Sequence, residues 1–170
     1  MTEQANWLND EEATLWRTFL ALEGRLHLEI QRDLKNSSGL TEPEFEVLAH
    51  LSEAPGPLRM TALADALKWE RSRVSHQVTR MAKRGLVQRS VCAEDGRGAF
   101  VSTTEEGMRE IEKAAPDHVA TVRRVFLDRL DDDDKRELAR LLILVEGTDG
   151  GSQDCAATRT SDATGVPSKA

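Results

Sequence analysis

Hydrophobic residues recur at helical spacing in two short segments between residues 59 and 91. These positions are Leu63, Ala64 and Leu67 in the first segment and Val74, Val78 and Met81 in the second. Intervals of three and four place each set on one face of a helix. Gly85 follows the second set and predicts its end, because glycine readily adopts the backbone conformation that closes a helix. The pattern therefore predicts two helices joined by a tight turn.

Longer apolar stripes lie on both sides of this pair. Residues 10 to 36 predict one long helix, with apolar positions at Leu15, Phe19, Leu22, Leu26, Ile30 and Leu34. A second helix begins after Thr41, which forms a capping box with Glu44, and ends before Pro55.

Two more helices are predicted near the carboxyl end. Thr103 or Thr104 caps the first, whose apolar side holds Met108, Ile111, Ala115, Val119, Val122, Phe126 and Leu130. Asp131 to Asp134 begin the second, and its buried side is expected to hold Leu138, Leu141, Leu142 and Val145. The stripes within residues 10–36 and 105–146 are larger than one small core requires.

A β-hairpin is predicted between the two halves. Residues 86–91 and 99–102 favour strands, and the glycine-containing segment 92–98 joins them as a turn. Most residues from 147 to 170 are small or polar, and we expect this segment to form a flexible tail. The predicted fold class is therefore mainly α with a small β-hairpin.

Charge is distributed unevenly along the chain. The whole sequence carries a net charge of -7, but residues 56 to 104 hold nine Lys or Arg against four Asp or Glu. This segment is therefore +5 and the remainder is -12. A basic module in an acidic body suits local binding to a polyanion and opposes indiscriminate adhesion to it.

The basic module has one predominantly polar helix face. Opposite the stripe of Val74 and Val78 we expect Arg71, Ser72, Arg73, Ser75, His76, Gln77, Thr79 and Arg80. These side chains supply donors and acceptors for phosphates and base edges, which favours double-stranded DNA as the partner. The alternative is a protein-interaction module, an anti-regulator without DNA binding. Such a surface should expose large apolar residues, which this helix face lacks.

Other functions find little support in the residues. A Gly-rich phosphate loop, a metal-binding Cys pattern and a partnered nucleophile are all missing, so we expect no enzyme, no metal and no cofactor. Neither an apolar run of membrane length nor a signal peptide is present, which indicates a cytoplasmic protein with no membrane partner. Cys92 and Cys155 are too few and too distant for a zinc site.

Three segments together resemble the MarR family of bacterial transcriptional regulators, over about residues 10 to 146. They are LTEPEFEVLAHLSE, MTALADALKWERSRVSHQVTRMAKRGLVQR and AEDGRGAFVSTTEEG, the last with an Asp-x-Arg signature at residues 95–97. The resemblance implies a winged helix-turn-helix domain over residues 41–104. It also implies a dimerisation region formed by residues 10–36 and 105–146, and hence a homodimer on an inverted-repeat operator.

Site residues follow from the same resemblance. The recognition helix, roughly Arg71 to Arg84, would enter the major groove, while Arg97 in the wing reaches the minor groove and Asp95 orients it. The family's usual behaviour implies a repressor released by a small aromatic or lipophilic ligand. The chain departs from the family at Lys68-Trp69-Glu70, where a small turn with a Ser or Asp cap is usual.

A few residues have two interpretations. Trp69 packs between the two helices of the motif or touches DNA, and the first is favoured. Cys92 is a redox trigger, as in some relatives of the family, or an inert strand residue; nearby carboxylates disfavour its thiolate. His27 and His50 line a ligand pocket or belong to the surface and core.

Overall fold

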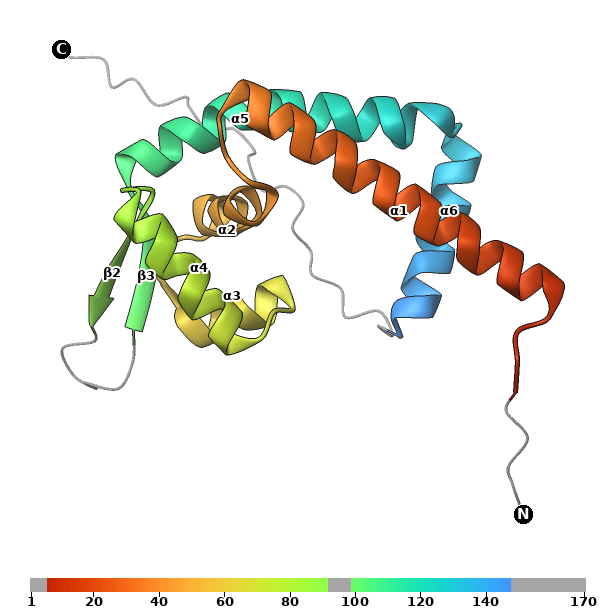
Figure 1. Ribbon diagram of the computed structural model, residues 1–170, viewed down its shortest axis with the longest axis horizontal. Helices are drawn as coiled ribbons and strands as arrows, with labels where there is room; N and C mark the ends of the chain where they lie inside the picture. Colours follow the sequence, from red (N-terminus) through yellow and green to blue (C-terminus); the bar gives the residue numbers. More distant parts are fainter. Residues whose placement is uncertain (1–5, 92–98, 148–170) are drawn as a thin grey trace, which may run out of the picture. The chain divides into compact units, whose positions relative to one another are not determined.

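The computed structural model describes residues 6–91 and 99–147. Its elements, in chain order, are α1 (Asp10–Ser37), α2 (Glu42–Glu53), β1 (Leu58–Arg59), α3 (Met60–Leu67), α4 (Arg71–Lys83), β2 (Val87–Val91), β3 (Ala99–Thr103), α5 (Glu105–Val125), the 3-10 turn η1 (Leu127–Arg129) and α6 (Asp132–Glu146). Figure 1 shows them along the ribbon, coloured from the N-terminus to the C-terminus. The prediction of a mainly helical chain with a small β-hairpin is confirmed.

Helix starts follow the capping signals of the sequence. Asn9, Thr41 and Asp131 each form a capping box with an acidic residue three positions later. Thr104, one of the two predicted caps of α5, accepts a hydrogen bond from the backbone N–H of Gly107. Such reciprocal bonds satisfy donors that a helix start otherwise leaves unpaired.

The sheet has three antiparallel strands in the order β1-β3-β2. β3 pairs with β2 over its full length, from Val87 opposite Thr103 to Val91 opposite Ala99. β1 adds two residues on the other side of β3. The sequence did not predict β1, because two residues are too short to show an alternating pattern.

The hydrophobic core lies where α2, α3 and α4 meet the sheet and the ends of α1 and α5. Its fully buried side chains include Leu34, Leu48, Leu63, Val74, Val78, Met81 and Val101. The stripe on α1 enters this core only in its second half. Leu15 and Phe19, in the first half, remain 72% and 50% exposed.

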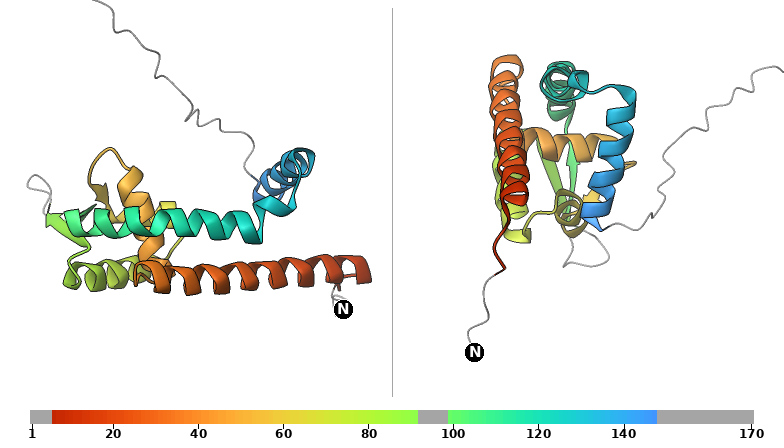
Figure 2. Two further views of the ribbon diagram at one scale, coloured as in Figure 1. Left: turned by 90° about the horizontal axis from the view of Figure 1, so that it is seen from above. Right: turned by 90° about the vertical axis from the view of Figure 1, so that its right-hand side faces the viewer.

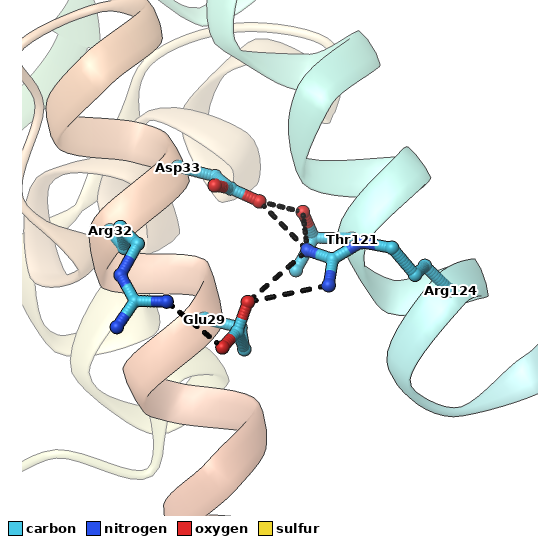
Figure 3. Close-up of polar contacts among 5 residues, drawn as sticks. All are labelled: Glu29, Arg32, Asp33, Thr121 and Arg124. Atoms are coloured by element: carbon cyan, nitrogen blue, oxygen red, sulfur yellow. Dashed lines mark hydrogen bonds and ion pairs between the residues drawn. The ribbon is translucent and has the colours of Figure 1, made fainter.

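Polar contacts join α1 and α5, which run side by side in opposite directions (Figure 2). The Arg124 guanidinium on α5 reaches Glu29 and Asp33 on α1 at 3.3 and 3.2 Å, and Asp33 also accepts a hydrogen bond from Thr121 (Figure 3). Thr121 is buried. These contacts fix the register between the two long helices.

Leu130 begins a second compact unit, which contains α6. None of its residues is buried. The sequence predicted a buried side at Leu138, Leu141, Leu142 and Val145, but the last three are 40%, 51% and 85% exposed, so this prediction is wrong for the single chain. The described part of this unit has no second element against which these side chains could pack.

No helix within residues 6–91 and 99–147 is both long and apolar enough to cross a membrane.

Candidate nucleic-acid interface

The α3-turn-α4 motif presents α4 to solvent on one side. Val74, Val78 and Met81 on α4 are completely buried against the core. Seven of the eight residues predicted for the outer face are exposed: Arg71, Ser72, Arg73, Ser75, His76, Thr79 and Arg80. Packing of the apolar stripe thus determines which side chains a ligand can reach.

This exposed surface is strongly cationic. Helix α4 contains Arg71, Arg73, Arg80 and Lys83 and no acidic residue. Its hydroxyl groups also face outward, and Thr79 donates a hydrogen bond to the Ser75 carbonyl at 2.7 Å. The surface combines positive charge with hydrogen-bonding groups, as contacts to phosphates and base edges require.

Gln77 is the one residue predicted for the outer face that is buried. We expected it on the outer face, but its side chain is buried and its Oε1 accepts a hydrogen bond from the Arg80 guanidinium. A residue three positions after Val74 lies close to the apolar stripe, so the core covers it. Gln77 therefore orients Arg80 from beneath.

The turn between α3 and α4 has an unusual backbone. Lys68 has φ +55°, in the left-handed region, where glycine is usual. The backbone N–H of Trp69 bonds to the Ala64 carbonyl at 3.0 Å and that of Lys68 to Asp65 at 3.3 Å, which closes α3 as a Schellman motif. Glu70 caps α4 without a side-chain hydrogen bond, as expected of a weak cap.

Trp69 lies half-buried against the core, as the favoured interpretation expected. Its outer ring face is also occupied. The Cζ atom of Arg73 lies 3.9 Å from the ring centroid, which is a cation–π contact. The sequence did not predict this pairing, because Trp69 lies in the turn before α4, where helical spacing does not apply.

Arg84 connects the end of α4 to α2. Its Nη1 lies 2.6 Å from both carboxylate oxygens of buried Glu44, which also accepts from the backbone N–H of Thr41 at 2.9 Å. Burial by itself would raise the pKa of Glu44. The hydrogen bonds from Thr41 and Arg84 outweigh it, so the pKa lies below its ordinary value. Glu44 remains a carboxylate and holds the recognition helix in place.

Two further exposed cations lie on the sheet, and one of them contacts α4. Arg59 on β1 stacks over the Phe100 ring at 5.0 Å, and Arg89 on β2 lies 3.4 Å from the Thr79 hydroxyl. Both belong to the basic module, but neither is among the site residues that the sequence predicts. Neither lies on a predicted helix face, which is why the periodicity gave no signal.

The wing tip lies outside the described residues. This applies to Asp95 and Arg97, predicted to act in the minor groove, and to Cys92, for which a redox role was considered.

Neither of the two histidines considered for a ligand pocket lines the hollow beside the α1–α2 connection. His27 on α1 is half exposed and contacts Glu42 at 2.5 Å, while His50 on α2 is exposed. A hollow of about 510 Å³ lies beside the α1–α2 connection and is lined by Gln31, Lys35, Gly39, Leu40, Thr41, Glu42 and Pro43. A small molecule could fit there by size.

Comparison with known proteins agrees with this geometry. A sequence profile described as "MarR family" matches residues 38–98, which span α2 to the wing. The transcriptional regulator HosA of Escherichia coli is 31% identical over 103 residues, covering 61% of this chain and 75% of HosA. The chain belongs to the MarR family.

Solved structures of MarR regulators extend the likeness over most of the chain. AbsC, a MarR family transcriptional regulator from Streptomyces coelicolor, is 42% identical with a TM-score of 0.79, covering 84% of this chain and 97% of AbsC. Sco3205, another MarR regulator from that organism, was solved in complex with DNA. It is 35% identical with a TM-score of 0.80, covering 88% of this chain and 95% of Sco3205. This protein is therefore a winged helix-turn-helix transcriptional regulator of the MarR type.

Proposed function

We propose that this protein binds a specific double-stranded operator through α4. One observation carries the proposal: the exposed face of α4 holds four cations and no acid. Helices of this kind read base edges in the major groove from their first turns, and their cations contact phosphates. That Sco3205 was solved in complex with DNA supports DNA as the partner.

Roles within the site follow from position. The first two turns carry Arg71, Ser72, Arg73, Ser75 and His76, and we assign base contacts to Arg73 and His76. Thr79 and Arg80 lie further along and suit the phosphate backbone. Arg97 in the wing is assigned to the minor groove, with Asp95 restricting its direction.

The active species is proposed to be a homodimer on an inverted-repeat operator. Large apolar side chains stay exposed on the first half of α1 and on α6, among them Leu15, Trp16, Phe19, Leu144 and Val145. Exposed apolar surface of this extent favours a protein partner, and a second copy fits the two-fold symmetry of operator DNA. The dimerisation region would comprise residues 10–36 and 105–146.

Regulation is proposed to be repression in the bacterial cytoplasm, relieved by a small aromatic or lipophilic ligand. The hollow beside the α1–α2 connection supports this, since its lining residues adjoin both α1 and the capping box of α2. A ligand that binds better to one arrangement of these helices would shift the spacing of the recognition helices. No catalytic role is proposed.

Selection of bound duplexes from a random double-stranded library tests the proposal. We expect a preferred sequence with dyad symmetry. Alanine at Arg73 or His76 should cost about 1 to 3 kcal/mol of binding free energy on it and relax discrimination at one or two positions of each half-site. Lys113→Ala, which removes an exposed cation from α5, serves as the matched control.

Arg97→Ala separates the role of the wing from that of α4. It should weaken binding on all sequences and reduce the salt slope by about one unit, because one phosphate-associated cation is lost. If the selection from the random library enriches no DNA sequence, the alternative of a protein-interaction module explains the site better. If Arg97→Ala leaves both the salt slope and the affinity for DNA unchanged, Arg97 does not contact DNA.

A further inference from the structure

Trp69 and Arg73 form a unit that spans the turn and the first turn of α4. The indole is half-buried and packs against the hydrophobic core. Arg73 lies four residues later and is exposed, with its Cζ 3.9 Å from the centre of the indole ring. Contacts with the core therefore hold the indole in place, and the guanidinium of Arg73 lies over the indole ring.

The guanidinium of Arg73 differs from those of Arg80 and Arg84 in its hydrogen bonding. The Arg80 guanidinium donates to Gln77, and that of Arg84 donates to Glu44. Among residues 6–91 and 99–147, no hydrogen bond or ion pair engages the guanidinium of Arg73. Its polar groups are available to a ligand while its direction is restricted.

Stacking restricts a guanidinium without using its donors. A cation–π contact is an attraction between the positive charge and the ring and uses no hydrogen-bond acceptor, so the five N–H groups of the guanidinium can still bind a ligand. A guanine presents two acceptors, O6 and N7, along the major groove, and an arginine edge matches them with two parallel hydrogen bonds. A guanidinium held in advance also loses less rotamer freedom on binding.

We propose that Trp69 is a positioning residue for base recognition: it holds Arg73 so that the edge of the guanidinium meets a guanine in each operator half-site. This inference rests on the proposed function and specifies one base of the operator. The large residue at the turn, which departs from the usual family pattern, thereby acquires a role. Trp69 itself need not touch DNA.

A double-mutant cycle on the highest-affinity duplex from the random library tests the coupling. Trp69→Leu should weaken binding about 3- to 10-fold, in line with the usual strength of a cation–π contact. In an Arg73→Ala background the same change should have no further effect. In an Arg80→Ala background it should keep its full effect, because Arg80 is held by Gln77 instead. Trp69→Phe should restore most of the affinity.

Equal losses from Trp69→Leu in the wild-type and Arg73→Ala backgrounds would overturn the inference and leave the proposed function intact. If the wild-type protein prefers no duplex, both the proposed function and the proposed base recognition are wrong. Replacing the guanine of each half-site should abolish the effect of Trp69→Leu. If the effect persists on the altered duplex, the assignment to guanine is wrong.

Nuclear magnetic resonance of the free protein provides a readout that does not depend on DNA. The Nε–Hε resonance of Arg73 should be shifted upfield by the indole ring current, and Arg73→Lys identifies the signal. Trp69→Phe should retain part of the shift. An ordinary resonance position in the wild-type protein would show that no stack forms, even if Trp69→Leu proves too unstable to study.

Discussion

Lys68 occupies a backbone conformation that its side chain disfavours. Its φ of +55° closes α3 in the left-handed region, which costs a residue with a Cβ roughly 1 to 2 kcal/mol. Lys68→Gly should therefore raise the free energy of unfolding by about 0.5 to 1 kcal/mol, since the greater freedom of glycine in the unfolded chain offsets part of the gain. Urea unfolding measures the change.

The matched control for this prediction is Ala66→Gly, two residues earlier on the exposed side of α3. There the backbone is helical, so glycine should lower the free energy of unfolding by about 1 kcal/mol. A loss of stability in both variants would mean that Lys68 is not strained.

His118 makes stability depend on pH. Its ring packs on Phe45 with centroids 4.3 Å apart, and its Nδ1 is buried with no hydrogen-bond partner in the described part of the chain. Burial lowers the pKa of His118, and nearby Glu42 opposes this only in part. The unfolded chain therefore binds a proton at a higher pH than the folded chain does. Stability should fall as pH decreases below about 6.5, the ordinary histidine value.

His118→Phe should reduce this loss, because phenylalanine keeps the packing on Phe45 and binds no proton. At pH 8 His118 is neutral in both the folded and the unfolded chain. The free energy of unfolding of the variant should then match that of the wild type within about 1.5 kcal/mol. Chemical unfolding from pH 8 to pH 5 compares the two. Identical pH profiles would exclude His118 as the source.

At the scale of elements, the Glu44–Arg84 pair connects α2 to the end of α4. The carboxylate is buried, while the guanidinium is 47% exposed. Arg84→Ala should lower the free energy of unfolding by about 1 to 3 kcal/mol, since the buried carboxylate loses a charged donor. Thermal unfolding with a Glu44→Gln partner variant and the double variant measures the coupling.

Acid dependence provides a second measure of the same pair. The pKa of Glu44 lies below its ordinary value in the folded chain. The contribution of the Glu44 carboxylate to stability is therefore present above about pH 4.3, and it is lost as the pH falls through the pKa of Glu44 in the folded chain. Glu44→Gln should lack this component of the acid loss. If the losses of stability in Arg84→Ala and Glu44→Gln simply add in the double variant, Glu44 and Arg84 act independently.

At the scale of the whole molecule, exposed apolar residues on α1 and α6 predict assembly. Phe19→Asp with Leu144→Asp should convert a dimer of 18.9 kDa chains to monomers without unfolding the core, because both side chains are exposed in the single chain. Sedimentation at micromolar concentration measures the species present. Ala21→Asp introduces the same charge about half a turn away on α1 and should leave the dimer intact.

The operator should reflect the same symmetry. Half-site centres about 10 base pairs apart, or a multiple of that helical repeat, would place one α4 in each successive major groove of one DNA face. Selected duplexes without dyad symmetry, or a wild-type protein that sediments only as a monomer, would contradict the dimeric arrangement.

The sequence by itself determined much of the local structure. Periodic apolar residues, capping boxes at Thr41 and Asp131 and the glycine after α4 specify helices through bonds between near neighbours in the chain. The outer face of α4 follows from the position of Val74 and Val78, so seven of its eight predicted residues are exposed as expected. The unevenness of charge is likewise a property of the sequence.

Tertiary structure decided what depends on neighbours distant in the chain. β1 exists only because β3 lies beside it, and Glu44 becomes a buried ion-pair partner only where α4 ends. Gln77 is covered and Leu141 is uncovered for the same reason: burial is set by the surrounding elements and not by the polarity of the residue. The stack of Arg73 on Trp69 likewise required the turn conformation at Lys68, which spacing alone does not specify.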